Sequence, residues 1–265
     1  MDAYKKTNSS GIAFRHSTVS HRTGMFADLH CHNHFELIYV VSGDIAHVVE
    51  GRKYLLGAGD LVLVQPSTYH YLQILSDAPY ERYNILFDPL SHDIPAALKL
   101  PKELEVINLS QNPILSELFP KMDLYSHASE ADFSRLLHLL LNELCMNLLL
   151  FPHQKPQKET VISPVLTRAL EYINDNLFTV KDIEEVAKKL YISSSYLYRL
   201  FRSSMHQSPS KYIQEKRLLA AQRLLQSGNK PTTVYRECGF REYPTFFRNY
   251  SNYFGHSPSS DYRKH

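Results

Sequence analysis

The spacing of apolar residues changes once along this chain, and the change limits the folds that it can adopt. Up to about residue 88, apolar residues lie in short β-rich runs at 35–42, 46–50, 61–65 and 83–87, separated by glycine-containing turns. From Asp132 to Leu150 they recur every three or four residues, which is the period of a helix with a wide apolar face. We therefore expect an α+β chain of several domains, with a barrel of short strands followed by helices.

Composition along the chain suggests where these domains begin and end. Residues 1–27 are polar and irregular, and we expect an N-terminal arm that could close over the next domain. Residues 28–110 are assigned to the β-barrel, and residues 111–151 to a helical segment, with helices at 114–125 and 132–150. Residues 152–162 contain two prolines and few apolar residues, which is typical of a linker. Residues 163–265 form a second, all-α domain.

Basic residues are concentrated in that second domain. Residues 161–265 contain 16 Lys and Arg against 9 Asp and Glu, a net of +7, whereas residues 1–160 contain 13 against 18, a net of −5. A basic domain joined to an acidic one indicates that only the C-terminal part meets a polyanion such as nucleic acid. The alternative is that this excess is ordinary surface charge.

Cysteine usage and the N-terminal sequence bear on the compartment. Cys31, Cys145 and Cys238 lie far apart without CxxC spacing, which argues against a disulfide framework or a structural zinc site. The N-terminus shows no apolar signal core, and polar residues interrupt the longest apolar run. We expect a cytoplasmic protein in a reducing compartment, with no membrane partner.

One segment of the C-terminal domain has the pattern of a helix-turn-helix unit. Residues 181–190 have one apolar face with a small Ala187, a short turn follows at Tyr191 and Ile192, and Leu197 and Phe201 begin a second apolar face. The second helix then presents types that reach base edges and phosphates. These outward residues are Ser194, Ser195, Tyr198, Arg199 and Arg202.

The pattern recurs in weaker form downstream. A shift of 49 residues places Phe246 on Leu197, Arg248 on Arg199 and Tyr250 on Phe201. The second outward set is Tyr243, Phe247 and Arg248. One helix over 209–226 joins the units, and two readers on a rigid connector could enter successive major grooves about 34 Å apart. The alternative is a generic bundle of packed helices.

Residues with N-cap preference mark the expected helix starts in this domain. Ser163, Thr179, Ser193 and Ser208 each have a side-chain oxygen that can accept a hydrogen bond from the first turn of a helix. Ser163 and Ser208 are followed by proline, which favours the first helical position.

With these residues in place, the last hundred residues resemble the DNA-binding domain of AraC/XylS-type regulators. The matching positions are 187–202, Tyr212-Ile213, Arg217-Leu218, 221–225, Gly239-Phe240, Phe246, Arg248, Phe254-Gly255, Ser257-Pro258 and Tyr262-Arg263. The resemblance implies a bacterial regulator, which we expect to be an activator, that binds double-stranded DNA beside a promoter and acts on RNA polymerase. Departures at Tyr235, Pro244, Phe247 and Tyr250, and one extra residue before Tyr262, affect the expected base readout of the second unit.

Histidines before the first long strand form the other notable pattern. His30, His32, His34 and Glu36 recur with a period of two, so on a strand they would all point to one face. Together with later residues they resemble the two signature motifs of cupin barrels. The matching positions are His30, His32, Glu36 and Gly43 in the first motif and Gly59, Asp60, Pro66 and His70 in the second.

That resemblance leaves three possibilities open: a metal site, a metal-free ligand pocket, or no pocket. In cupin enzymes these positions bind iron or manganese, which would make His30, His32, Glu36 and His70 the ligands here. Thr68 and Ile74 depart from the second motif, and regulators of this family generally bind an organic effector without metal. We therefore expect no cofactor and a sugar as effector.

The expected effector pocket combines polar groups with aromatic rings. The polar residues are His32, Glu36, His70, Arg82 and Asn84. Tyr39, Tyr71 or Tyr83 could stack on a sugar face, or could simply belong to the barrel core.

Two other functions fit parts of the sequence. One is a metal-dependent cupin oxygenase or isomerase, although an enzyme has no need of a basic repeated domain, and the sequence shows no phosphate loop or nucleophile triad. The other is a metal- or redox-responsive regulator that uses Cys31 with the histidines. The apolar helix at 132–150 either packs on its own barrel or joins two copies into a homodimer.

Overall fold

The computed structural model describes residues 4–9, 11–19, 29–88, 100, 105–150 and 159–262. The chain divides into two compact units. The first comprises Met1–Val49 and Lys53–Thr160, and the second comprises Glu50–Arg52 and Val161–His265. The division after Thr160 falls within the segment predicted to be a linker.

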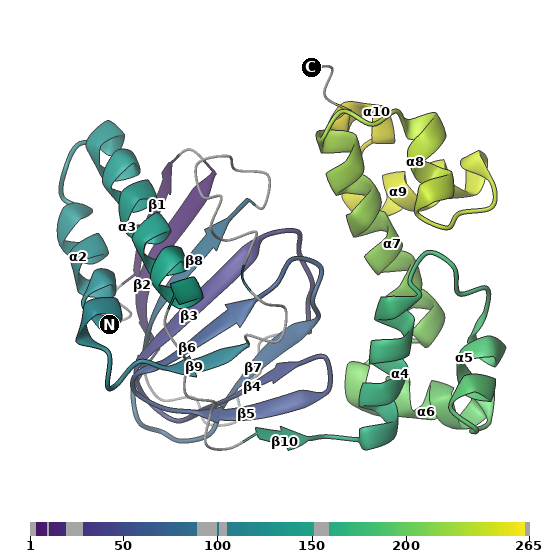
Figure 1. The fold of residues 1–265 in the computed structure, drawn as a ribbon, viewed down its shortest axis with the longest axis horizontal. Coiled ribbons are helices and arrows are strands. Elements are labelled where there is room, and N and C mark those ends of the chain that lie inside the picture. Colours follow the sequence, from purple (N-terminus) through teal and green to yellow (C-terminus); the bar gives the residue numbers. More distant parts are fainter. Residues whose placement is uncertain are drawn as a thin grey trace. The chain divides into compact units, whose positions relative to one another are not determined.

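The first unit contains two β-sheets (Figure 1). One has six strands in the order β1-β2-β8-β3-β6-β9, and the other has four in the order β10-β5-β4-β7. The strands are β1 Tyr4–Ser9, β2 Ile12–Val19, β3 Phe35–Ser42, β4 Ile45–Val49, β5 Arg52–Leu56, β6 Asp60–Val64, β7 His70–Ile74, β8 Tyr80–Phe87, β9 Val106–Asn108 and β10 Glu159–Val161. The expected β-rich domain is confirmed, but in the described part of the chain its two sheets do not close into one barrel.

The six-stranded sheet is buried on both faces, which explains why β3 is an almost continuous apolar run. One face packs against the other sheet through residues such as Ile38 and Val62, which cluster with Leu72 of β7. The opposite face, which includes Leu37 and Ile85, belongs to the core under the helices. Side chains alternate along each strand, so neighbouring residues of β3 serve different cores.

Three helices cover that second face (Figure 1). They are α1 Pro113–Ser116, α2 Leu118–Tyr125 and α3 Glu130–Leu150. The buried face of α3, with Phe133, Leu137 and Leu141, packs on its own sheet. Among the described residues, α3 is the one helix that has the length and apolar character to cross a membrane. Since its buried face forms part of the sheet's core, we interpret it as a core helix.

The predicted irregular arm is wrong for the part that the structure describes. β1 and β2 form two strands of the large sheet, and β2 pairs with β8 from Ile12 opposite Phe87 to Val19 opposite Tyr80. Ile12 and Phe14 alternate with partly exposed neighbours and are almost fully buried. Residues 20–28 lie outside the described residues, as do 152–158 of the predicted linker, whereas β10 lies near the end of that linker.

The second unit is helical. Its helices are α4 Pro164–Asp175, α5 Ile183–Lys189, α6 Ser194–Met205, α7 Pro209–Gln226, α8 Pro231–Glu237, α9 Tyr243–Phe254 and α10 Pro258–Asp261. Ser163, Ser193 and Ser208 cap α4, α6 and α7 as predicted, each accepting a bond from a backbone N–H in the first turn. Thr179 does not cap α5. Asp182 does so instead, while the Thr179 hydroxyl donates to the carbonyl of Asn176.

Candidate functional site

The first candidate DNA-reading helix is α6, which follows α5 after a short turn. Ala187, Leu197 and Phe201 are buried and hold the two helices together. The predicted outward residues lie on the free side of α6. Ser195, Tyr198, Arg199 and Arg202 are exposed, and Ser194 is half-buried. The Arg199 guanidinium lies 5.5 Å from the ring centre of Tyr196, and this contact limits where it can point.

The second candidate reader is α9, preceded by α8. Phe246 and Tyr250 are fully buried, whereas Phe247 and Arg248 are exposed as predicted. Tyr243 is half-buried, and its ring packs on those of Tyr235 and Phe246, with ring centres 5.6 and 6.0 Å apart. Tyr243 therefore supports the core at the start of α9 in addition to any contact with DNA.

The unusual residues of the second unit are accommodated in its fold. Pro244 lies in the first turn of α9, where a missing backbone N–H costs little. The Tyr250 hydroxyl donates to Asp261 over 2.6 Å, and burial, together with this bond, raises the pKa of Tyr250. The Tyr235 hydroxyl accepts from Arg236 over 2.8 Å. These polar contacts allow tyrosines to replace smaller or less polar residues.

Arg217 on α7 ties the two helix-turn-helix units together. Its guanidinium donates to the carbonyls of Leu177 and Val180, before α5, over 2.8 and 2.7 Å, and to that of Gly239 in the α8–α9 turn over 3.1 Å. Gly239 has φ +77°, and a Cβ there would lie 2.5 Å from the carbonyl oxygen of Phe178. The loop between α4 and α5 is therefore in close contact with the turn of the second unit, so the two units share one rigid support.

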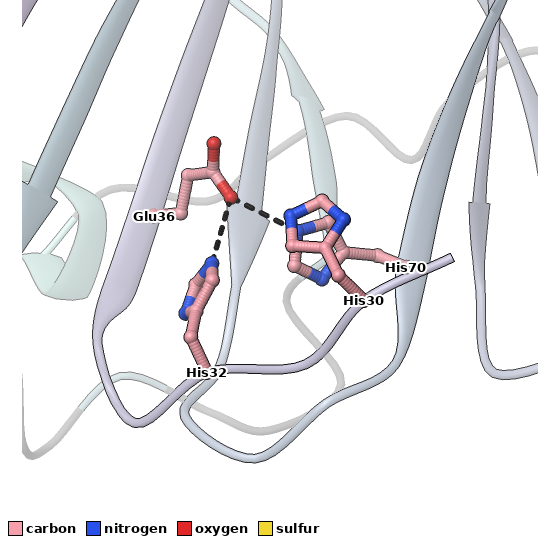
Figure 2. Close-up of side chains that lie close together, drawn as sticks. All are labelled: His30, His32, Glu36 and His70. Atoms are coloured by element: carbon pink, nitrogen blue, oxygen red, sulfur yellow. Dashed lines mark hydrogen bonds and ion pairs between the residues drawn. The ribbon is translucent and has the colours of Figure 1, made fainter. Parts of the chain in front are cut away.

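A second polar site lies in the first unit, between the two sheets. Glu36 of β3 and Asn84 of β8 face this interior from the large sheet, and His70 of β7 faces it from the small one. His32 joins them from the segment before β3. The Glu36 carboxylate accepts from the Asn84 amide through one oxygen, while its other oxygen lies 3.1 Å from His32 Nε2 and 3.0 Å from His70 Nε2 (Figure 2).

The electrostatic environment keeps this buried carboxylate charged. Burial would raise the pKa of Glu36, but the hydrogen bonds and charges of His32 and His70 outweigh it and hold that pKa well below its usual value. A charge with this little solvent contact requires close compensation. The interior is therefore a polar site with one fixed anion rather than a continuation of the apolar core.

Sequence reasoning missed one residue of this interior, His47 of β4. Its ring is fully buried and lies 5.7 Å from that of His70. Neither ring nitrogen has a hydrogen-bond partner among the described residues. Burial lowers the pKa of His47 to about 3, with the charge of His70 contributing next. His47 lies two residues from apolar Ile45 and two from apolar Val49, and on a strand this spacing places all three side chains on the same inward face.

Comparisons with known proteins match both parts of the chain. A model of the AraC-like ligand binding domain matches residues 13–144, and a model of a helix-turn-helix domain matches residues 186–265. The chain belongs to the AraC family of transcription regulators. It thus combines a DNA-binding helix-turn-helix part with a ligand-binding domain, as the sequence predicted.

Relatives of this AraC-family chain cover different parts of it. It is 28% identical over 245 residues to an uncharacterized transcriptional regulator, YfiF, of Bacillus subtilis, which covers 87% of this chain and 77% of the relative. It is 25% identical over 224 residues to the raffinose operon regulatory protein RafR of Pediococcus pentosaceus, covering 79% and 77%. It is 33% identical over 100 residues to the regulatory protein SoxS of Salmonella typhimurium, covering 37% and 92%.

Of the two possibilities for the tyrosines in the ligand domain of this AraC-family protein, a place in its core holds for Tyr39 and Tyr83. Tyr39 and Tyr83 face the helices, where Tyr39 stacks on Phe119 with ring centres 4.3 Å apart, and Tyr71 alternates with the inward-facing His70. None of these tyrosines lines the polar interior. The expected strand of four aligned side chains also begins too early. β3 starts at Phe35, so His34 stays outside the cluster that gathers His30, His32 and Glu36.

Proposed function

We propose that this AraC-family regulator is a transcription activator controlled by a sugar that binds in the polar interior of its first unit. The observation that carries the proposal is the fully buried His47 ring near the charged Glu36, since neither of its ring nitrogens has a hydrogen-bond partner in the part of the chain that the structure describes. Buried polar groups are normally hydrogen-bonded, so these nitrogens point to an ordered guest such as water or a ligand.

The chemistry of the lining supports a polyhydroxylated guest. His32, Glu36, His70, Arg82 and Asn84 offer both donors and acceptors, which suits hydroxyl groups better than an apolar molecule. Arg82 lies half-buried on β8 with its guanidinium 5.3 Å from the ring centre of Tyr80. The similarity to a protein named as a raffinose operon regulator extends over 79% of this chain, which supports a sugar over other polar ligands.

On the DNA side, we assign base and phosphate contacts to the free faces of α6 and α9. These residues are Ser194, Ser195, Tyr198, Arg199, Arg202, Tyr243, Phe247 and Arg248. The sugar would favour one arrangement of the two units over another and so change the population that binds DNA. In this proposal the protein acts in the bacterial cytoplasm as a homodimer that contacts RNA polymerase beside a promoter. A purely enzymatic role would not explain why the chain has a helix-turn-helix part.

The test couples ligand binding to DNA binding in the full chain. An operator is first selected from a pool of random duplexes, and sugars are screened by thermal shift. A sugar at a hundred times its Kd should stabilise the native state by about 2.7 kcal/mol. The same sugar should change operator affinity, and Asn84→Ala should abolish its effect without changing DNA binding in its absence. Sugars that neither stabilise the chain nor alter its operator affinity would contradict the proposal.

A further inference from the structure

Four side chains in the first unit converge on one point (Figure 2). His30 and His32 come from the segment before β3, Glu36 from β3 and His70 from β7. One potential ligand atom from each lies within 4.8 Å of those of the other three. Their burial is graded, since His30 is exposed, His32 half-buried and the other two buried. A small ion could thus reach the cluster from solvent past His30.

The protons on two of these rings are fixed by their outer contacts. His32 Nδ1 lies 3.1 Å from the carbonyl oxygen of His34, and His70 Nδ1 lies 2.9 Å from that of Thr68. A carbonyl oxygen can only accept, so both Nδ1 atoms must carry the proton. A neutral imidazole has a single N–H, and therefore both Nε2 atoms present lone pairs to the cluster.

Those two lone pairs face a carboxylate oxygen. Each Nε2 atom lies 3.0–3.1 Å from the same oxygen of Glu36. Three electron pairs directed at one another are stable only with positive charge between them. A cation at the point of convergence would supply that charge. Ligand histidines in metal sites characteristically donate their other N–H to a carbonyl or carboxylate, as His32 and His70 do here.

The distances suit a metal ion. With metal–ligand bonds of about 2.1 Å, neighbouring ligands in tetrahedral or octahedral sites are roughly 3.0–3.4 Å apart. The two separations from Glu36 are within that range, and a potential ligand atom of His30 lies within 4.8 Å of those of the other three. Imidazole and carboxylate donors favour first-row transition metals such as zinc, nickel, cobalt and iron over magnesium or calcium.

We propose that His30, His32, Glu36 and His70 bind one divalent transition-metal ion, with open coordination positions that take hydroxyl oxygens of the effector. The second half of this inference rests on the proposed function, whereas the first half does not. The ion supplies the charge that the converging lone pairs require. Arg82, Asn84 and His47 remain available to hold the rest of the effector.

The test uses the full chain, stripped with a chelator and titrated with Zn²⁺ or Co²⁺ at pH 8, where free histidines are neutral. We expect one equivalent of either ion to bind and to raise the Tm, and bound Co²⁺ to show the visible absorption of a low-coordinate site. Mg²⁺ at the same concentration should have no effect. Binding of less than a tenth of an equivalent of Zn²⁺ and Co²⁺ would overturn the proposal.

Variants assign the site to these residues. His32→Ala and Glu36→Gln should each weaken Zn²⁺ binding at least ten-fold, whereas His34→Ala, an exposed neighbour outside the cluster, should bind like the parent. His30→Ala removes an exposed ligand and serves if the buried variants fail to fold. Unchanged Zn²⁺ affinity in every folded cluster variant would rule out this site.

The two proposals can fail separately. If the stripped chain still binds its operator and responds to a sugar but takes up no metal, then the metal site is wrong and the proposed function stands. If Zn²⁺ binds but no sugar changes its affinity or the operator affinity, then the ion is present without an organic partner, and the effector half of the inference is wrong.

Discussion

Arg199 is the residue that we expect to contribute most to base recognition. It is exposed on the free side of α6, and its guanidinium can make a bidentate contact with a guanine. Arg199→Ala should weaken specific operator binding by about 1–3 kcal/mol and relax the sequence preference at one position. Fluorescence anisotropy with operator and scrambled duplexes measures both. Arg168→Ala, an exposed arginine on α4, is the control, and equal effects of the two changes would refute the assignment.

His47 predicts a pH dependence of stability. Its folded-state pKa of about 3 lies below the ordinary histidine value of 6.5, so the unfolded chain binds more protons between these values. Its contribution is therefore complete above pH 6.5 and is lost as the pH falls towards 3, by about 1.4 kcal/mol per pH unit. Urea unfolding of His47→Leu should show a shallower loss of stability between pH 6.5 and 4. Parallel pH profiles for the variant and the parent would contradict this.

At the residue scale the sequence predicted which groups gather, but not their protonation. The resemblance to the cupin motifs placed His32 and Glu36 in one polar site with His70, although the strand expected from the period-two spacing begins only at Phe35. It could not show that the Nδ1 atoms of His32 and His70 face carbonyls, because those contacts depend on the backbone path of 30–34 and 66–70. That geometry is what favours a metal over the metal-free pocket expected from the sequence.

At the scale of elements, two glycines with the same φ allow the cost of backbone strain to be measured separately from the cost of tight packing. Gly239 and Gly255 both have φ +77°, but only Gly239 has neighbours where a Cβ would be. Both alanine variants should lose roughly 1 kcal/mol from the left-handed conformation. Gly239→Ala should lose at least about 1 kcal/mol more, because the Phe178 carbonyl must move. Urea unfolding midpoints compare the two variants, and equal losses would mean that the α8–α9 turn is not tightly packed against the α4–α5 loop.

Helix ends were predictable where local chemistry decides them. Ser193 and Ser208 cap their helices because a serine oxygen beside the first turn needs no tertiary partner. The cap predicted at Thr179 is wrong because Asp182, three residues later, caps α5 instead, and the first turn that follows it is acidic. β1 and β2 were missed because polar residues dominate this segment, and its pairing partner β8 lies some seventy residues away.

At the scale of the whole molecule, α3 indicates how two copies could associate. Its outer side carries Leu139, Met146 and Leu150, which are 67%, 45% and 68% exposed and recur at helical spacing. Burying such a stripe against a second copy would remove it from water. We expect sedimentation equilibrium at micromolar concentration to show a dimer. Leu139→Glu with Leu150→Glu should make it a monomer, whereas Ile114→Glu on α1 should not. A monomeric parent would end this prediction.

Domain content was the most predictable feature of the chain. The change of apolar period and the repeated helix-turn-helix pattern identify a sensor part and a DNA-binding part before any tertiary contact is known. The sheet arrangement was less predictable, because strands that share a face can be joined as a closed barrel or as two stacked sheets with the same alternation.

The hydrogen bonds of Arg217 to the α4–α5 loop and to the α8–α9 turn have a consequence for the DNA that this protein can use. Each added base pair rotates one half-site about 34–36° relative to the other. Because Arg217 holds α6 and α9 in one rigid arrangement, the two helices cannot rotate to follow a displaced half-site. The duplex itself would have to twist or bend, at a cost that depends on its own stiffness. Promoters under this regulator should therefore keep one invariant distance between their two recognition boxes.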